Sequence, residues 1–414
     1  MIIADPAPPV LTRSEHGSAS DRGRRSSRPV LRVVAIVTVP RGGGAREVDF
    51  WHPMTEPRMS PTPATAASLV RPAIAELAGY VPGEQPQAGK WIKLNTNENP
   101  YAPSPAVARA IAATAEGRTL AKYPDPLATV FRMRAAEILG VDPDWIICGN
   151  GSDDLLTILV RSFVGQGEWL RIAYPSYILY RTLAGLQGAA CEEVFYERDW
   201  SLADAFAAPR PGLKLAFLAN PNSPSGTLVS PGRVRELADR LPCPLIVDEA
   251  YGDFADSNCL ELVKQCERVI VTRSFSKSYA LAGLRFGFAV ARPEVIAELR
   301  KVKDSYNCDA LSIAAATAAI DDRAWLADNR ARILATRRRL TDAMRALGYD
   351  AVESQANFVW CTHPERPHKP VYEALKARQI LIRFMQYPGW GDGLRITVGT
   401  DDEIDAFLAV MNTL

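Results

Sequence analysis

The sequence predicts an α/β fold in which a large domain with a mostly parallel sheet flanked by helices precedes a smaller α+β domain. Two observations lead to this prediction. Short apolar runs of strand length alternate with helical segments from about residue 145 onwards. Five of these runs end in a polar or glycine-rich motif. In α/β sheets that edge, beyond the carboxyl ends of the strands, is where ligands bind.

The composition is that of an ordinary soluble protein, with 47% hydrophobic and 23% charged residues among 414. A net charge of +1 gives no reason to expect a nucleic-acid partner. No run approaches the roughly 18 apolar residues that a membrane span needs. The seven cysteines are scattered and the four histidines lie away from the strand ends, so we expect reduced thiols, a cytoplasmic protein and no metal site.

Residues 1–58 differ from the rest because they are rich in Pro, Gly, Ser and Arg and contain no Lys. We expect a disordered segment or a mis-annotated extension, with translation beginning at Met54 or Met59. The apolar run at 30–39 is a weak signal-peptide candidate that Arg32 interrupts. We expect the remaining chain to form an N-terminal arm that contributes to the small domain (59–117), a large domain (118–305) and a small C-terminal domain (306–414).

The expected helices and strands follow from the spacing of the apolar residues and from the positions of Gly and Pro. Helices are expected over 68–78, over 104–115 with Pro105 in the first turn, and over 127–139 before Gly140. A first strand is expected over 90–94, and the buried strands of the large domain over 145–148, 168–173, 213–218, 245–247 and 268–272. Later helices are expected over 293–303, 325–347, 371–378 and 403–411, and strands of the small domain near 357–360, 380–384 and 394–398.

The strand-end motifs contain candidates for an anion site. The segment 149–154 opens a helix, and its free N–H groups and the positive end of the helix dipole suit a phosphate. An ordinary glycine turn in which Ser152 or Asp153 caps the helix is the simpler alternative. Ser274, Ser276 and Arg285 could complete the same phosphate site.

Three further residues point to a planar, aldehyde-bearing ligand. Tyr177 could stack on such a ligand, although a packed surface aromatic is the simpler reading. Asp248 ends a buried strand and needs a cationic or N–H partner. A protonated pyridine nitrogen would supply one, although a helix cap or an ion pair is the simpler reading. Lys277 could form a Schiff base with an aldehyde, although a solvated loop is the commoner role of an isolated Ser-x-Lys motif. Together with a phosphate site, these residues suit pyridoxal 5′-phosphate, PLP.

The chain from about Leu69 to Leu414 resembles the fold-type I PLP-dependent transferases, and within them the histidinol-phosphate aminotransferase family of the class I/II aminotransferases. The motifs that carry this resemblance are, in order, YVPGE at 80–84, NENPY at 97–101, YP at 123–124, GSDD at 151–154, YPSY at 174–177, NSPSG at 222–226, DEAY at 248–251, SFSK at 274–277, AGLR at 282–285 and LRITVGT at 394–400.

The resemblance implies a role for each matching residue. Lys277 would bind the cofactor aldehyde and move a proton, Asp248 would pair with the pyridine N–H, and Tyr251 would donate a hydrogen bond to the ring oxygen. The implied cofactor-binding residues are Gly151, Ser152, Asp153, Tyr177, Asn222, Ser223, Asp248, Tyr251, Ser274, Ser276, Lys277 and Arg285, with Tyr123 reaching the cofactor of the other subunit of a homodimer. The implied substrate-binding residues are Tyr80, Asn97, Arg383 and Arg395.

One position departs from the family pattern. The family usually reads Asn-Asn-Pro-Thr-Gly, and its second Asn contacts the ring oxygen of the cofactor. Here that position is Ser223, with Asn222 before it. Either Ser223 donates a shorter hydrogen bond or the loop presents Asn222.

The expected function is transamination between histidinol phosphate and 2-oxoglutarate in histidine biosynthesis. An aromatic amino-acid aminotransferase and a phospho-amino-acid decarboxylase of the same fold, similar to the cobalamin-pathway branch, stay open as alternatives. A non-catalytic PLP-binding regulatory protein is the alternative from a different class. The two arginines of the C-terminal part, Arg383 and Arg395, indicate an anionic substrate without distinguishing a carboxylate from a phosphate.

Overall fold

The computed structural model describes residues 65–77, 83–86 and 88–414 of the 414-residue chain. The chain divides into two compact units, Met1–Pro63 and Ala64–Leu414, and all of the described residues belong to the second. The expectation for residues 1–58 and the role assigned to Tyr80 therefore lie outside the described residues.

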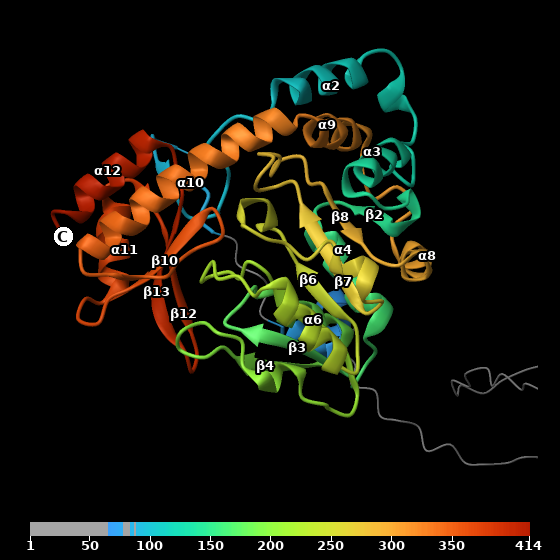
Figure 1. Ribbon diagram of the computed structural model, residues 1–414, viewed down its shortest axis with the longest axis horizontal. Helices are drawn as coiled ribbons and strands as arrows, with labels where there is room; N and C mark the ends of the chain where they lie inside the picture. The colour runs from blue at the N-terminus through green and yellow to red at the C-terminus, as the bar shows by residue number, and fades with distance from the viewer. Residues whose placement is uncertain (1–64, 78–82, 87) are drawn as a thin grey trace, which may run out of the picture. The chain divides into compact units, whose positions relative to one another are not determined.

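A seven-stranded sheet forms the centre of the large domain (Figure 1). Its spatial order is β2 (Ile146–Gly149), β8 (Gly287–Val290), β7 (Val269–Ser274), β6 (Leu245–Asp248), β5 (Leu213–Ala219), β3 (Trp169–Tyr174) and β4 (Ala190–Phe195). Of the seven strands, β8 alone runs in the direction opposite to the other six. The carboxyl ends of β2, β3, β5, β6 and β7, where the five motifs stand, therefore lie at one edge of the sheet.

Successive residues of the central strands pack on opposite faces of the sheet. Val269 and Val271 of β7 belong to one apolar cluster, and Ile270 belongs to another. A strand buried on both faces reads as a continuous β-branched run, which is why this segment is predictable. Side chains of α3 (Thr129–Leu139), α6 (Pro231–Arg240) and α9 (Ala310–Asp321) fill the first cluster, and those of α4 (Ser152–Phe163), α5 (Leu179–Gln187) and α8 (Pro293–Val302) fill the second.

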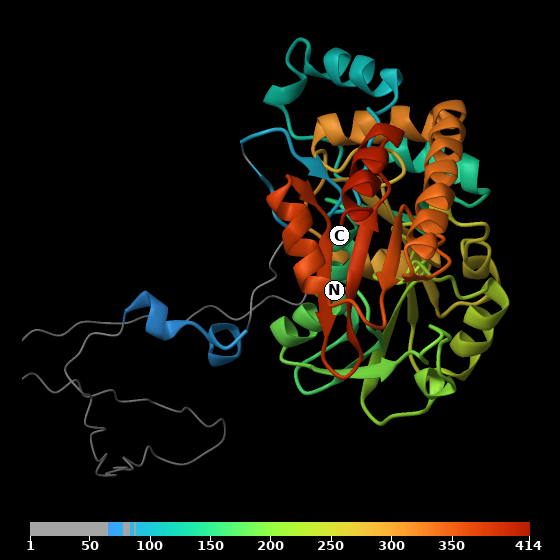
Figure 2. The same ribbon diagram turned by 90° about the vertical axis from the view of Figure 1, so that its left-hand side faces the viewer.

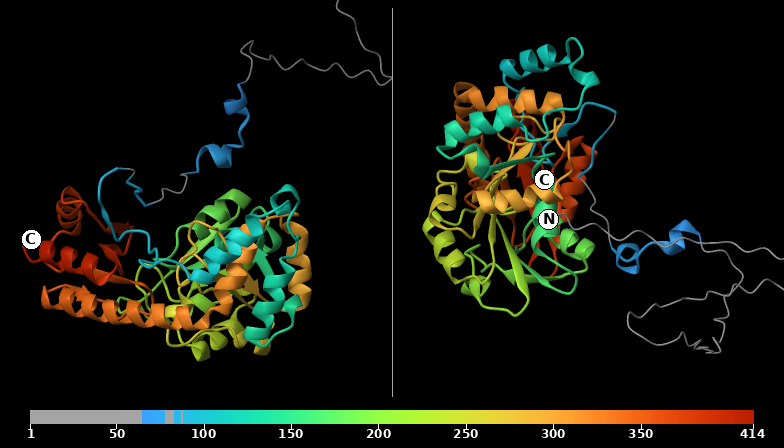
Figure 3. Two further views of the ribbon diagram at one scale, coloured as in Figure 1. Left: turned by 90° about the horizontal axis from the view of Figure 1, so that it is seen from above. Right: turned by 90° about the vertical axis from the view of Figure 1, so that its right-hand side faces the viewer.

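A four-stranded antiparallel sheet forms the core of the C-terminal part (Figure 2). Its order is β12 (Arg383–Tyr387), β13 (Gly391–Thr397), β10 (Phe358–Thr362) and β9 (Asp350–Ala351). Helices α11 (His368–Ala377) and α12 (Asp401–Met411) accompany it, and α10 (Arg323–Ala346) runs from α9 to this sheet (Figure 3). The N-terminal part adds α2 (Pro105–Ala115), which packs on α9, and β1 (Ile92–Lys93), which pairs with β11 (Ile380–Leu381).

The five predicted strands of the large domain are confirmed to within two residues at each end. The helix expected over 68–78 is wrong. The described part of that range contains the end of a short 3-10 turn (Ala66–Leu69) and the four-residue α1 (Pro72–Ala75). The ring of Pro72 keeps Arg71 extended, at ψ 134°, and this separates the two turns.

The strand expected over 380–384 is divided between two sheets. Ile380 and Leu381 pair with β1, whereas the chain from Arg383 onwards pairs with β13. The expected helix over 127–139 begins at Thr129, because Ala128 has a left-handed φ of 49°. The division of the second unit at residues 117/118 and 305/306 stays a prediction. In the part of the chain that the structure describes, no helix combines the length and the apolar character that crossing a membrane requires.

Candidate active site

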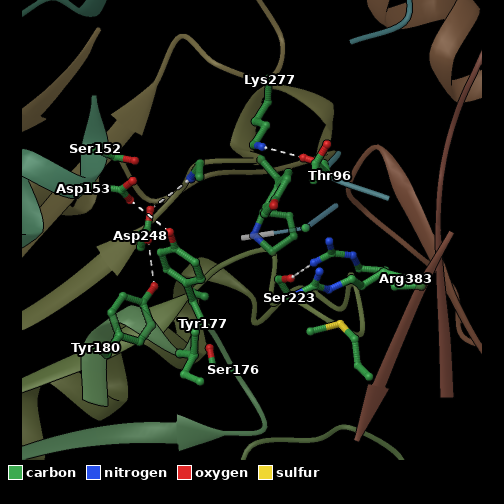
Figure 4. A pocket seen from close by; sticks show the side chains of 18 of the residues that line it. Thr96, Ser152, Asp153, Ser176, Tyr177, Tyr180, Ser223, Asp248, Lys277 and Arg383 are labelled. Atoms are coloured by element: carbon green, nitrogen blue, oxygen red, sulfur yellow. Dashed lines mark hydrogen bonds between the residues drawn. The ribbon is translucent and has the colours of Figure 1, made fainter. Parts of the chain in front are cut away.

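A cavity of about 670 Å³ lies at the carboxyl ends of the parallel strands and extends to β12 and β13 of the small sheet. Most of the predicted site residues line it, namely Ser152, Asp153, Tyr177, Ser223, Asp248, Tyr251, Ser274, Ser276, Lys277, Arg285, Arg383 and Arg395. Figure 4 shows Asp248 and Lys277 directed toward the same space from separate elements. The sheet therefore brings together motifs that are up to 243 residues apart, the separation of Ser152 and Arg395.

One end of the cavity suits a phosphate. Helix α4 begins at Ser152, and no side chain caps its first N–H groups. Arg285 donates to Ser276 Oγ over 3.1 Å, and its Nη2 lies 3.4 Å from Asp153 Oδ2. A Cβ at Gly151 would stand 2.6 Å from Arg285 Nη2, and Gly151 has a φ of 81°, so this close approach requires glycine. Free N–H groups, a serine hydroxyl and a guanidinium fit a phosphate dianion.

Asp248 ends β6 with only 4% of its surface exposed. Its Oδ2 accepts a hydrogen bond from Tyr180 Oη over 2.7 Å, and its Oδ1 accepts from Thr272 Oγ1 over 3.1 Å. Burial raises the pKa of this carboxyl group above its ordinary value. Among the described residues, no Lys or Arg forms an ion pair with it. A protonated pyridine nitrogen would supply the missing positive partner.

Lys277 is half-buried beyond the end of β7, and its Nζ donates to the backbone oxygen of Thr96 over 3.1 Å. The same amine lies 5.9 Å from the centre of the Tyr251 ring. Tyr251 Oη accepts a hydrogen bond from Asn97 Nδ2 over 2.9 Å, which orients the phenol. A primary amine, a phenol and a buried carboxylate around one space fit an aldehyde-bearing pyridine ring with a ring oxygen.

The loop after β5 presents Ser223 to the cavity. Ser223 Oγ accepts a hydrogen bond from Arg395 Nη1 over 3.0 Å. Asn222 is buried and does not line the cavity, and its Nδ2 donates to the backbone oxygen of Pro175 and to Ser225 Oγ. Of the two residues considered for the ring oxygen, Ser223 is thus the one that faces the space.

Two arginines stand at the opposite end of the cavity. Arg383 of β12 and Arg395 of β13 are register partners on neighbouring antiparallel strands. Arg395 Nη2 also donates to the backbone oxygen of Asn95 over 3.0 Å, and its guanidinium lies 5.3 Å from the Phe358 ring centre. Like charges that face each other across a sheet repel, and an anion between them removes that cost.

A buried chain of charged groups holds the neighbours of Asp248 and Lys277. Glu249 accepts from Arg273 Nε over 2.9 Å, and Arg273 Nη1 donates to Asp253 Oδ1 over 2.6 Å. Ser278 donates to the other oxygen of Asp253 over 2.5 Å. Glu249 is 1% and Arg273 7% exposed. This ionic chain, Glu249–Arg273–Asp253–Ser278, fixes the end of β6 relative to the loop that carries Lys277.

Besides Asn222, three predicted residues whose positions the structure describes do not line the cavity, namely Gly151, Asn97 and Tyr123. Gly151 acts through the room that it leaves for Arg285. Asn97 is 1% exposed and contacts Tyr251 and Thr397, so it lies behind the phenol. Tyr123 is 80% exposed and stacks on Tyr306 with ring centres 4.4 Å apart.

Sequence reasoning missed the two hydroxyls on Asp248. Thr272 stands in a strand, where a lone threonine is unremarkable. Tyr180 lies in the first turn of α5, and Tyr177 precedes that helix, with the two ring centres 5.7 Å apart. No local pattern connects a tyrosine at the start of a helix with an acid 68 residues further along the chain.

Comparisons with known proteins identify the family of this chain. The family model for aminotransferase class I and II matches residues 89–411. A histidinol-phosphate aminotransferase of Rhodopirellula baltica is 59% identical over 342 residues, which are 82% of this chain and 94% of that protein. One from Geobacter sulfurreducens is 46% identical over 347 residues, 83% of this chain and 99% of that protein.

A solved structure gives the same result at the level of the fold. The histidinol-phosphate aminotransferase of Sinorhizobium meliloti, in complex with pyridoxal-5′-phosphate, superposes with a TM-score of 0.74 at 27% identity, covering 84% of this chain and 98% of that one. The family model covers well over half of the chain and the relatives match nearly their full length. This chain belongs to the aminotransferase class I and II family.

Proposed function

We propose that this chain is a PLP-dependent aminotransferase that transfers the amino group of histidinol phosphate to 2-oxoglutarate in histidine biosynthesis. The observation that carries the proposal is the single cavity in which Lys277, Asp248 and the α4 N-terminus face the paired Arg383 and Arg395. The names of relatives at 59% and 46% identity support the choice of amino donor.

The cofactor would be held at three points. The α4 N-terminus, Ser276 and Arg285 would bind its phosphate, Asp248 would hold the ring N–H, and Tyr251 would donate to the ring oxygen. When bound, PLP supplies an aldehyde that condenses with amines and a protonated ring that withdraws electrons. Tyr177 would cover the face of that ring.

The protein's own residues would carry the proton transfer. Lys277 Nζ would hold the cofactor aldehyde before substrate arrives, and would then accept the proton that leaves the substrate carbon and return it to the cofactor carbon. The Thr96 carbonyl, 3.1 Å from Nζ, would orient the amine between these two positions. Arg383 and Arg395 would bind the phosphate of the donor or a carboxylate of the acceptor, which places the reacting carbon near Lys277.

We also propose a homodimer. Val130 and Met133 stand three residues apart on α3 and are 65% and 60% exposed. Leu120, Tyr123 and Tyr306 are exposed by 57%, 80% and 46%. A second copy of this chain would cover these side chains, and Tyr123 would then reach the partner's cofactor phosphate. The seven cysteines, all unpaired, support a reducing compartment such as the cytoplasm.

The decisive experiment measures glutamate formation from 2-oxoglutarate with histidinol phosphate or phenylalanine as donor. We expect turnover with histidinol phosphate that exceeds turnover with phenylalanine. Turnover with phenylalanine alone would replace the proposal by the aromatic aminotransferase. Release of carbon dioxide from a phospho-amino acid without glutamate formation would replace it by the decarboxylase, and retention of PLP without any turnover would indicate the regulatory protein.

A further inference from the structure

Tyr180 stands behind the candidate cofactor site and contacts its acid directly. The side chain is fully buried, and its ring stacks on Phe217 with centres 4.6 Å apart and planes 2° apart. Its hydroxyl donates to Asp248 Oδ2 over 2.7 Å, the shortest of the contacts made by that carboxylate (Figure 4). The stacked ring leaves the hydroxyl little freedom, so this hydrogen bond is a fixed part of the site.

The other oxygen of Asp248 is also fixed. Oδ1 accepts from Thr272 Oγ1 over 3.1 Å and from the backbone N–H of Ala250 over 3.2 Å. Both carboxylate oxygens therefore have donors from the protein, and the carboxylate cannot turn about its Cβ–Cγ bond without losing them. A ligand in the cavity therefore meets the Asp248 carboxylate in one fixed orientation.

The surroundings of Asp248 and Tyr180 have opposing effects on the pKa of the carboxyl group. Burial raises the pKa of Asp248, the Tyr180 and Thr272 hydroxyls act to lower it, and the Asp153 carboxylate raises it further. Burial and then Asp248 raise the pKa of Tyr180 well above its ordinary value, with smaller contributions from the phenols of Tyr177 and Tyr196. Tyr180 therefore keeps its proton over the accessible pH range and acts only as a donor.

We propose that Tyr180 is a positioning residue that keeps Asp248 ionised, so that the proton shared between this carboxylate and the cofactor ring stays on the ring nitrogen. The inference rests on the proposed function, because it needs PLP in the cavity. Each hydrogen bond donated to a carboxylate stabilises the anion relative to the neutral acid. Without the Tyr180 hydroxyl the carboxylate becomes the stronger base, and the shared proton moves toward it.

The test is a Tyr180→Phe variant, which keeps the ring and its stacking on Phe217 and removes one oxygen. Tyr196→Phe is the matched control. Tyr196 is a buried tyrosine, 3% exposed, and its hydroxyl has no hydrogen-bond partner among the described residues. Each protein is reconstituted with PLP labelled with ¹⁵N in the ring, and the ¹⁵N chemical shift is followed by solid-state NMR from pH 6 to pH 9.

We expect the wild type and Tyr196→Phe to show a protonated ring nitrogen throughout. In Tyr180→Phe the ¹⁵N shift should lie closer to that of a neutral pyridine at every pH, because the proton moves within the pair and none is released to solvent. The ratio of the two proton positions should change by about tenfold or more. A second variant protects the test against misfolding: 3-fluorotyrosine at position 180 keeps the hydroxyl, donates more strongly, and should leave the ¹⁵N shift at the wild-type value or move it further toward the protonated one.

Two results separate this inference from the proposed function. A Tyr180→Phe variant whose ¹⁵N shift matches that of the wild type at every pH, or a fluorotyrosine variant that shifts in the same direction as Tyr180→Phe, overturns the role of Tyr180 while leaving the cofactor site intact. A wild-type protein that does not bind PLP overturns the proposed function itself, and this inference with it.

Discussion

Arg395 Nη1 lies 3.0 Å from Ser223 Oγ, so a side chain of the small sheet bonds directly to the loop that follows β5 of the large sheet. Ser223 stands where the family pattern has asparagine. The same serine therefore faces the candidate cofactor position and the candidate anion site. This contact connects the two ends of the cavity. Mutating each of the two residues in turn can therefore distinguish an effect on the substrate from an effect on the cofactor.

Replacing Arg395 by Gln should weaken substrate binding more than it slows the chemistry. A hydrogen bond to a charged group contributes about 1.5–3 kcal/mol, so the KM for 2-oxoglutarate should rise about 10- to 100-fold. Steady-state kinetics over a range of 2-oxoglutarate concentrations measures this. The control is Arg338→Gln, at an exposed position of α10. An unchanged KM in Arg395→Gln would remove this residue from the substrate site.

Ser223→Ala should retune the site without disabling it. A neutral hydrogen bond contributes about 0.5–1.5 kcal/mol, so kcat/KM should fall by about tenfold or less. The pH dependence of the visible absorbance of bound PLP should shift, because one donor near the ring oxygen is lost. Ser162→Ala, whose hydroxyl bonds only within its own helix, is the control. A loss far beyond tenfold would mean that Ser223 has a chemical role.

Lys277→Ala should abolish covalent retention of PLP. Borohydride reduction of the wild type followed by mass spectrometry should locate the cofactor on the peptide that contains Lys277. The variant should show no such adduct, and turnover should fall about 10²- to 10⁴-fold, the range for a removed acid–base group. Lys301→Ala, at an exposed lysine paired with Glu298, should behave as the wild type. An adduct that survives in Lys277→Ala would contradict the assignment.

Asp248→Asn should stabilise the cofactor-free protein at neutral pH. Burial raises the folded-state pKa of Asp248 above its unfolded value. The contribution of this group to stability is then complete below the unfolded pKa and is lost as the pH rises through the folded pKa. The cofactor-free variant should melt about 2 °C or more above the wild type at pH 8.

Both the pH and the cofactor should change this difference in melting temperature between Asp248→Asn and the wild type. It should shrink as the pH falls toward the ordinary carboxyl range near 4, and bound PLP should diminish it by supplying a positive partner for the wild-type carboxylate. Thermal unfolding at several pH values, with and without PLP, measures these changes. A wild type that is the more stable protein without cofactor at every pH would show that burial of the charge is compensated.

Val130→Glu together with Met133→Glu should separate the two copies of the proposed dimer. Two carboxylates placed on a surface that is buried between copies must be desolvated, at a cost of several kcal/mol. Sedimentation velocity should show the mass of one chain for the variant and of two chains for the wild type. Ala331→Glu, at an exposed position of α10, is the control. A wild type that sediments as a single chain would refute the dimer.

The strands of the large domain were predictable because they are buried on both faces. Residues 269–272 form an apolar β-branched run that fits no other role. β4 escaped prediction because ACEEVF alternates poorly and is mostly half-exposed at the edge of the sheet. β8 escaped because four residues, GFAV, directly follow the lysine loop. Burial alone does not decide the matter, because β8 is buried along its whole length but is too short to leave a clear local pattern.

The arrangement of the candidate site was predictable where a motif stands at the end of its own strand. Lys277 and Asp248 are two such cases, because the direction of the chain alone brings them to one edge. Asn97 and Tyr180 act through other residues, at sequence separations of 154 from Tyr251 and 68 from Asp248. Contacts of this kind depend on the final packing of helices on the sheet, which no local pattern specifies.

The buried ionic chain Glu249–Arg273–Asp253–Ser278 has a consequence for how this scaffold can diversify. It fastens Asp248 and Lys277 through residues of the large sheet and the lysine loop, and it takes no member from β12 or β13. Random variation at the cavity-facing positions of β12 should therefore yield proteins that still retain the cofactor and differ in the acids they accept. Reaction chemistry and substrate choice would then vary independently in this chain.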